Sequence, residues 1–340
     1  MSLPAAVRRV TVAFVAAGVV AACGGRTVTP ASPPAPHSSS TPAPSPVPTL
    51  LSPLTGLPVA ALGPVVAVKI DNVGDVGQTG LDATDVVYAE EVEGGLTRLL
   101  ALFSSTTPTA AGPVRSARES DLEVLGPYGK VAFAFSGANA GVLREIRRAN
   151  VVDDSYDTVT GAYSMDRQRP APYEFLVNVR KLAAQHPGAA ATDVGFRFSA
   201  APPAQAGNAA PGPAQHLTVR FPGTTLSATY ADGRYAISRN GRPLTTDRQP
   251  VTATNILLQT VTVRSSRYVD HNGARTPYSV TVGHGHASVL RGGLRYDGTW
   301  SRPSQTAPTT WTASGGGALA LVPGRTWVIL VPAGAPVATS

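Results

Sequence analysis

Between residues 54 and 199, hydrophobic residues come in short unbroken runs separated by segments with helical spacing. Four runs, at residues 65–70, 86–88, 99–103 and 131–135, predict strands that are buried on both faces. Residues 116–125 and 139–148 carry apolar positions three and four apart, as in Val142, Leu143 and Ile146, which predicts two amphipathic helices. Strands that alternate with helices predict an α/β layered sheet.

The pattern changes after residue 215. Short apolar runs at residues 217–221, 256–263, 278–282 and 327–331 alternate with turn-forming pairs. These pairs are Asp-Gly or Asn-Gly at 232–233, 240–241, 272–273 and 297–298, and they supply the positive φ angles of tight hairpins. The sequence therefore predicts an α+β protein, with an N-terminal α/β layered sheet domain (54–199) followed by a mainly antiparallel β domain (216–335). An Ala/Pro/Gly-rich linker (200–215) is expected between them.

The first residues have the pattern of a bacterial lipoprotein signal peptide. Arg8 and Arg9 precede an uncharged apolar stretch at residues 10–20, which is too short to span a bilayer. The stretch ends in Val-Ala-Ala-Cys at residues 20–23, a lipobox. We expect cleavage of residues 1–22 and acylation of Cys23, by a diacylglycerol on the sulfur and a further fatty acid such as palmitate on the amine. This predicts a protein anchored by lipid to the extracytoplasmic face of the bacterial cell membrane.

Residues 23–53 contain Cys23 and a stretch dominated by Pro, Ser, Thr and Ala, which predicts an extended spacer. Cys23 is the sole cysteine, so no internal disulfide can form. The net charge is +7, and the predicted cleavage removes two arginines and no acid, leaving +5. A basic surface favours anionic lipid headgroups or wall polymers, although codon bias toward arginine is a simpler explanation. Export makes nucleic acid an unexpected partner.

Three polar clusters adjoin the first-domain strands: residues 69–72, 85–98 and 112–120. Because they adjoin neighbouring strands, we expect them to meet at one sheet edge, where α/β proteins bind ligands. Ser116 is expected to cap the following helix, so that Arg115 and Arg118 face a phosphate or carboxylate. Asp71, Asp85 and Glu93 could hold a cation beside that anion. The ligand-binding candidates are Asp71, Asn72, Asp85, Glu93, Arg98, Arg115, Ser116 and Arg118. The structural alternative is that the arginines pair with these acids to fix loops.

Gly-His-Gly-His at residues 283–286 places His284 and His286 on one face of a strand, and His271 is a further candidate zinc ligand. Two polar residues on the solvent face of a hairpin are the more ordinary interpretation. The sequence contains no nucleophile elbow, P-loop, HExxH motif or dinucleotide fingerprint.

Several of these segments resemble the YerB-like family of bacterial lipoproteins. The resemblance runs through Ser-Pro-Leu-Thr-Gly-Leu-Pro at 52–58, Val-Lys-Ile-Asp-Asn at 68–72, Ala-Thr-Asp-Val-Val-Tyr at 83–88, Val-Glu-Gly-Gly-Leu-Thr-Arg at 92–98, Gly-Pro-Val-Arg-Ser-Ala-Arg at 112–118, Gly-Thr-Trp-Ser at 298–301 and Pro-Gly-Arg-Thr-Trp-Val at 323–328. It implies a two-domain fold and no known reaction. The chain departs from the pattern at Ala89, where relatives often carry an acid, and at residues 171–174, where many show a His-Asn pair.

These observations favour a non-catalytic envelope lipoprotein that needs no cofactor and binds an anionic wall or lipid-linked ligand, or a protein partner. A more distant similarity to LytR-CpsA-Psr phosphotransferases implies an enzymatic alternative acting on a polyprenyl-linked pyrophosphate. In that alternative Arg98, Arg115 and Arg118 clamp the pyrophosphate and Asp71 or Asp85 binds Mg²⁺. A third alternative is an adaptor for the cell-wall synthesis machinery.

Overall fold

The computed structural model describes residue 25 and residues 49–269 and 273–340. The predicted signal peptide, Cys23, most of the spacer, His271 and Asn272 lie outside the described residues. The fold is contained in one compact unit, Pro48–Ser340.

A mixed sheet of twelve strands forms the centre of this unit within the described residues. Its N-terminal strands are β1 (Val66–Ile70), β2 (Val86–Glu91), β3 (Thr97–Phe103), β4 (Val131–Ala134) and β5 (Val151–Asp153). Its C-terminal strands are β8 (Gly212–Pro213), β16 (Asn255–Val269), β17 (Arg275–Val280), β18 (Gly283–Arg291), β19 (Leu294–Arg302), β20 (Thr310–Ala313) and β21 (Thr326–Pro332). The main order is β20-β19-β18-β16-β21-β2-β3-β1-β4-β5, with β17 paired to β16 and β8 to β19.

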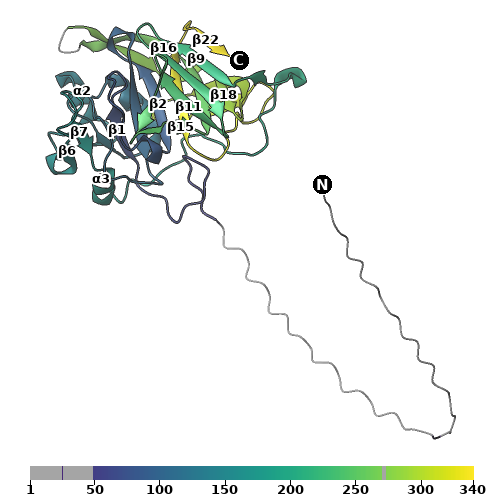
Figure 1. Ribbon diagram of the computed structural model, residues 1–340, viewed down its shortest axis with the longest axis horizontal. Coiled ribbons are helices and arrows are strands. Elements are labelled where there is room, and N and C mark those ends of the chain that lie inside the picture. The colour runs from purple at the N-terminus through teal and green to yellow at the C-terminus, as the bar shows by residue number, and fades with distance from the viewer. Residues whose placement is uncertain (1–24, 26–48, 270–272) are drawn as a thin grey trace, which may run out of the picture. The chain divides into compact units, whose positions relative to one another are not determined.

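The two predicted domains therefore share one sheet. β21 pairs in parallel with β2, from Val86 opposite Thr326 to Ala89 opposite Ile329, and on its other side it pairs in parallel with β16. In Figure 1 the blue N-terminal strands on the left continue into the green C-terminal strands on the right. The predicted strands of both segments are present, and the mixed α/β class, rich in strands, is confirmed.

A smaller sheet covers one face of the central sheet. It comprises β9 (His216–Arg220), β10 (Thr225–Ala231), β11 (Arg234–Arg239), β12 (Arg242–Pro243), β15 (Thr252–Ala253) and β22 (Val337–Thr339). Two further two-stranded ladders pair β6 (Tyr163–Met165) with β7 (Phe175–Val177) and β13 (Thr245–Thr246) with β14 (Gln249–Pro250). Apolar side chains of the small sheet, such as Tyr235, join Trp327 of the central sheet in one continuous core.

Two of the expected turns form tight hairpins, and one expectation is wrong. Asp232-Gly233 and Asn240-Gly241 both have positive φ, as a two-residue hairpin requires. Asp297-Gly298 instead lies inside β19, and Gly292-Gly293 make the turn between β18 and β19. A Cβ at Gly298 would lie 2.1 Å from the carbonyl oxygen of Thr312, so this glycine permits the close approach of β20.

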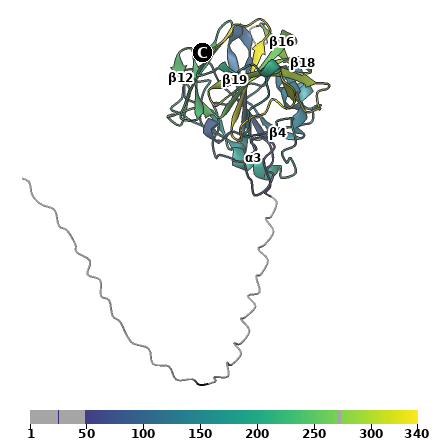
Figure 2. The ribbon, with the colours of Figure 1, turned by 90° about the vertical axis from the view of Figure 1, so that its right-hand side faces the viewer.

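The α-helices are short and number three in the described chain: α1 (Glu119–Leu125), α2 (Ala140–Ile146) and α3 (Val179–Gln185). In Figure 2, α3 and β4 lie low in the folded unit and β18 lies high. The expected cap at Ser116 is wrong, because the chain is still extended there and at Arg118. Arg118 is the N-cap residue of α1, and its N–H donates to Asp121 Oδ2 at 2.6 Å.

Both low-complexity segments contact the folded unit where the structure describes them. Ser52 is buried in it and Leu51 forms a β-bridge with Pro58, so the fold begins earlier than composition indicates. The 200–215 segment lies against the C-terminal strands, because Arg291 donates to the carbonyl oxygen of Ala200 (2.9 Å) and β8 pairs with β19. None of the helices in the described chain is long and apolar enough to cross a membrane.

Candidate functional site

Most of the candidate residues gather at one edge of the central sheet. β1 and β2 both run antiparallel to β3, so the carboxyl ends of β1 and β2 meet the amino end of β3 at the same edge. Asp71 follows β1, Glu93 follows β2 and Arg98 is the second residue of β3. The predicted convergence of three polar segments is therefore present at this edge.

Glu93 and Arg118 form a two-pronged ion pair at this edge. Arg118 Nε and Nη2 donate to the two oxygens of Glu93 at 2.8 Å each, and Thr276 Oγ1 adds a third hydrogen bond at 2.6 Å. Burial opposes ionisation of Glu93, but the hydrogen bonds and charge of Arg118 lower its pKa to about 2. This carboxylate is thus fully engaged with protein donors.

The tight turn that carries Glu93 depends on Gly95. Gly95 has φ +68, and a Cβ there would lie 2.5 Å from the Pro222 side chain. The Gly223 N–H donates to the carbonyl oxygen of Gly95 at 2.9 Å. The C-terminal segment therefore packs directly on the turn and helps to fix Glu93.

A second ion pair joins Asp71 to Arg115, with 3.2 Å between Oδ1 and Nε. The other oxygen of Asp71 accepts the N–H groups of Val73 and Gly74 at 2.7 and 2.9 Å. The Arg115 guanidinium lies 5.5 Å from the centre of the Tyr173 ring. Asp71 thus orients Arg115, while the neighbouring Asn72 donates to Thr97 Oγ1 at 2.8 Å and has a structural contact.

Arg98 lacks such a partner. Its residue surface is 8% exposed, and in the described chain its buried Nε and Nη1 make no hydrogen bond. Burial, together with the charges of Arg118 and Arg115, lowers the pKa of Arg98 to about 10, against the opposing charges of Glu93 and Asp71. A buried guanidinium with unmet donors is costly unless an acceptor reaches it.

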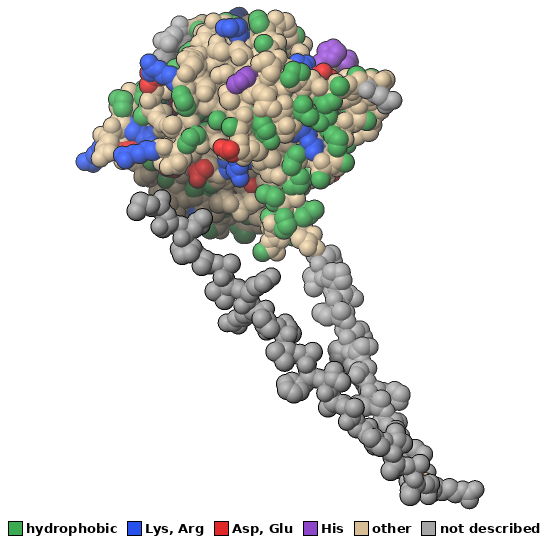
Figure 3. Space-filling model, turned by 45° about the vertical axis from the view of Figure 1, so that its right-hand side comes forward, with side chains coloured by type: hydrophobic (Ala, Val, Ile, Leu, Met, Phe, Trp, Pro, Cys, Tyr) green, Lys and Arg blue, Asp and Glu red, His purple; other side chains and the backbone are tan. Residues whose placement is uncertain are grey.

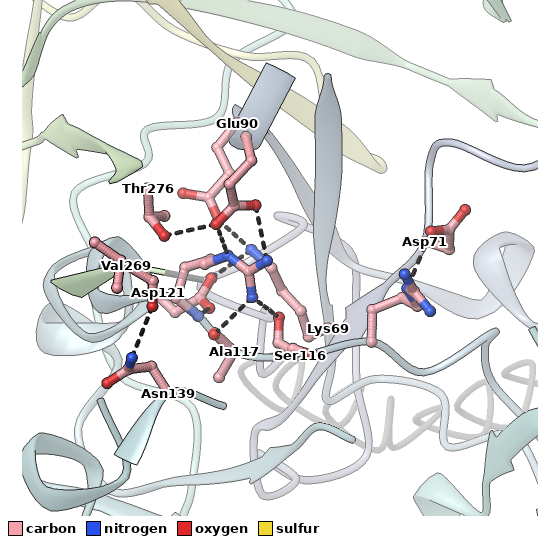
Figure 4. A network of polar contacts seen from close by, with 12 residues as sticks. Lys69, Asp71, Glu90, Ser116, Ala117, Asp121, Asn139, Val269 and Thr276 are labelled. Atoms are coloured by element: carbon pink, nitrogen blue, oxygen red, sulfur yellow. Dashed lines mark hydrogen bonds and ion pairs between the residues drawn. The ribbon is translucent and has the colours of Figure 1, made fainter. Parts of the chain in front are cut away.

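Next to these pairs is a buried charge cluster that the sequence did not single out. Lys69 Nζ donates to Glu90 and, at 2.6 Å, to Asp121 Oδ1 (Figure 4). Ser120 Oγ donates to Glu90 Oε2 at 2.7 Å. Burial and the charge of Glu90 raise the pKa of Asp121 to about 7, although Lys69 opposes this shift. Lys69 and Glu90 lie within the polar segments identified in the sequence. Asp121 lies on α1, and the sequence pattern does not predict that it contacts them.

A cavity of about 360 Å³ opens beside the Glu93–Arg118 pair, within the size range of small-ligand sites. Ser116, Arg118 and Asn139 of the first domain line it, with Tyr268 and Thr276 of the second. Its far wall is the β16–β17 hairpin, since β16 continues well beyond its last pairing with β21, at Val261. Sequence patterns did not indicate that this hairpin reaches the site.

Polar contacts fix the hairpin to α1 and α2 around the cavity. Ser266 Oγ donates to Glu119 Oε2 at 2.6 Å, and Tyr268 Oη donates to Glu145 Oε1 at 3.0 Å. Asn139 Nδ2 donates to the carbonyl oxygen of Val269 at 2.7 Å (Figure 4). The second domain therefore braces the site formed by the first.

Asp85 does not belong to this site, and the cation set of Asp71, Asp85 and Glu93 is not assembled. Asp85 precedes β2, whereas Glu93 follows it, so the six residues of β2 place them at opposite edges, about 20 Å apart. Asp85 Oδ2 instead accepts the N–H groups of Ser104 and Ser105 at 2.7 and 2.8 Å. Each of these acids thus serves as an acceptor for nearby backbone or arginine groups.

The histidine motif lies on β18, where His284 and His286 are both exposed. No group of three or more His, Cys, Asp or Glu residues that could hold a metal ion occurs among the described residues. His271 lies outside them.

Two family models match the two halves of the chain. The N-terminal domain of "Protein of unknown function (DUF3048)" matches residues 54–193, and the C-terminal domain of that family matches residues 217–328. The chain belongs to this family. The family boundary falls between β7 and β9 in sequence, yet the central sheet runs through both DUF3048 domains.

A protein of known structure has the same fold. The crystal structure of the YerB protein from Bacillus subtilis superposes with a TM-score of 0.68, covers 85% of this chain and 100% of that chain, and is 23% identical in sequence. The chain is also 35% identical over 101 residues to "Putative lipoprotein YerB" of Bacillus subtilis (strain 168). That match spans 28% of this chain and 30% of the relative. The resemblance to YerB-like proteins is confirmed, and the family has no assigned activity.

Proposed function

We propose that the chain is a lipoprotein anchored to the outer face of the cell membrane that binds an anionic group of the envelope at the Arg98 edge of its central sheet. The lipobox at Cys23 and the similarity to a protein named as a lipoprotein support the anchor. The arginines at the sheet edge support the ligand class. The membrane is thus one partner, and an anionic wall or lipid-linked group is the other.

The observation that carries the ligand class is the unpaired Arg98. Its neighbours Arg115 and Arg118 are each held by a carboxylate, which fixes their position and offsets their charge. Arg98 has no such acid and is destabilised by both guanidinium groups. A phosphate or carboxylate group bound at this edge would relieve the repulsion among the three cations.

The arrangement suits binding better than a phosphotransfer reaction. The acids predicted to hold Mg²⁺ or another cation already accept hydrogen bonds from protein groups. These acids are Asp71, Glu93 and Asp85. Their role in this proposal is to position the arginines, and no cofactor is required. Crosslinking in cells distinguishes this anion-binding function from that of a protein adaptor.

Calorimetric titration with a short-chain polyprenyl phosphate, a muropeptide and inorganic phosphate tests the ligand class. We expect Arg98→Gln to weaken binding of the recognised anion by about 10-fold or more, since a charge-assisted contact contributes about 1.5–3 kcal/mol. Arg148→Gln is the matched control, because the Arg148 side chain is 74% exposed and pairs with Glu145 rather than with an acid of this edge. Equal affinity in Arg98→Gln and the wild type would overturn the site. Crosslinking in cells that recovers a protein and none of these anions would favour the adaptor.

The anchor is tested separately by mass spectrometry of the protein isolated from its membrane. The expected product begins at an acylated Cys23. A bulk product that retains residues 1–22 without acyl groups would contradict the anchor and leave the anion site untouched.

A further inference from the structure

The loop of residues 49–64, hereafter the leucine loop, is an uncharged apolar surface at the start of the folded unit. Seven large apolar side chains in the described chain are more than a third exposed, and four of them are in this loop: Leu50, Leu51, Leu57 and Leu62. Pro58, Ala60 and Ala61 are exposed as well, and no charged residue lies between residue 49 and Lys69, while Asp82 and Arg234 line the hollow beside the loop. Scattered exposed leucines need no explanation, but a contiguous uncharged group indicates an interaction surface.

The exposure does not come from a loosely attached segment. Leu54 is fully buried at the centre of the loop, and the Gly324 N–H donates to the carbonyl oxygen of Thr55 at 2.7 Å. Leu51 and Pro58 form a β-bridge, which brings Leu50 and Leu51 next to Leu57. The loop is therefore fixed from within while its leucines face outward. Figure 3 shows hydrophobic side chains gathered at the lower right, where the described chain begins.

We infer that the leucine loop docks on the lipid bilayer to which the chain is anchored. This inference rests on the proposed anchor at Cys23. Along the chain, the loop is the first described segment of the folded unit after the predicted spacer, so it is the part of the unit joined most directly to the proposed anchor. Tethering turns docking into an intramolecular step with an effective concentration near the millimolar range, so a weak apolar contact is sufficient.

Docking would also orient the anion site. The leucine loop lies at the amino end of β1, and Asp71 and Arg98 lie at its carboxyl end, about 17 Å away along the strand. A bilayer in contact with the loop therefore leaves Arg98 on the edge that faces away from the membrane. The anion that Arg98 binds then comes from the aqueous or wall side rather than from the surface of the same bilayer.

Vesicle flotation tests the inference with the chain from residue 23 onward carrying Cys23→Ser, which retains the whole compact unit Pro48–Ser340. Neutral phosphatidylcholine vesicles remove the general attraction of a basic protein for anionic lipid. We expect Leu51→Ser with Leu57→Ser to lower the partition coefficient about 10-fold, as the loss of two apolar side chains at an interface predicts. Leu294→Ser, an exposed leucine elsewhere, and Arg98→Gln should leave partition within about 2-fold of the wild type.

A second variant keeps the test valid if the double leucine variant fails to fold, because it reports docking by a fluorescence change. In Leu57→Trp, we expect the tryptophan emission to shift to the blue on vesicle addition and to be quenched by brominated lipid. Equal partition of the wild type and the double leucine variant, or no quenching in Leu57→Trp, would overturn the inference. Self-association that the double variant abolishes would assign the loop to a second copy of the chain instead. Because the protein is not acylated and Arg98 is intact, failure here is distinguishable from failure of the anchor or of the anion site.

Discussion

Lys69 and Asp121 form an ion pair of 2.6 Å in which neither side chain is exposed to solvent. Lys69 also neutralises Glu90, so one ammonium group separates two buried carboxylates. Lys69→Met would leave both acids without their cation, and breaking a buried pair in this way costs about 3–5 kcal/mol. We expect a loss of that size in the free energy of unfolding in urea at pH 8. Lys130→Met, at an exposed lysine, should change it by less than about 0.5 kcal/mol. A small loss in Lys69→Met would contradict a charged cluster.

The same cluster gives the fold a dependence on pH. The pKa of Asp121 is raised from 3.8 to about 7, so the native state keeps a proton that the unfolded chain releases between pH 4 and 7. Stability from this group is therefore full below about pH 4 and declines as the pH rises to about 7, by about 4 kcal/mol at most. We expect the unfolding free energy of Asp121→Asn to fall less than that of the wild type between pH 5 and 7. Parallel curves for the two proteins in urea titrations would show that Asp121 is ionised throughout.

We expect Arg98 to lower the free energy of unfolding while being required for anion binding. Because its buried donors are unmet, Arg98→Met removes an unfavourable charge and keeps most of the apolar volume. We expect the free energy of unfolding to stay level or to rise by about 1 kcal/mol, while anion binding is lost. Thermal unfolding with and without phosphate measures both effects. A marked loss of stability would mean that Arg98 is a structural residue.

Arg118 should behave in the opposite way. Arg118→Met leaves Glu93 with Thr276 as its remaining side-chain partner, so we expect a loss of about 2 kcal/mol at pH 7. The pKa of Glu93 is lowered from 4.5 to about 2, so the stability it contributes is present above about pH 4.5 and is lost as the pH falls toward 2. The difference between wild type and variant should therefore shrink across that window. A constant difference down to pH 2 would argue that Arg118 acts through packing alone.

The shared sheet predicts that the two halves unfold together. Phe133 is fully buried on β4, and Phe133→Ala should cost about 3–5 kcal/mol. We expect hydrogen exchange of the β16 and β18 amides, in the other half, to accelerate by an equivalent factor. Unchanged protection of β18 in this variant would indicate two independently stable halves.

The strands of this protein were predictable because their hydrophobic runs are short, continuous and bounded by turn signals. Asp71, Glu93 and Arg98 were also predictable as neighbours, since each lies at or next to an end of a strand of the central sheet. Asp85 was misplaced, although its position before the strand already distinguished it from Glu93 after the strand. Attention to which end of a strand each polar residue occupies would have separated them.

Other parts of the site depend on long-range pairing that local patterns do not encode. The parallel pairing of β21 with β2 joins residues more than two hundred positions apart, and it makes one sheet of the two halves. The β16–β17 hairpin reaches the cavity because of that placement, so Tyr268 and Thr276 could not be assigned to it from the sequence. Likewise, the isolation of Arg98 is a property of three-dimensional packing, since acids are abundant near it in the sequence.

The position of β21 also bears on how the chain matures. β21 is the penultimate strand of the chain, yet it fills the gap between β2 and β16. Until it is synthesised, β2 is an edge strand whose backbone and apolar side chains have no neighbour on that side. A chain that stops short of residue 326 would therefore be prone to aggregation, and the nascent N-terminal half must be shielded until its last strands arrive.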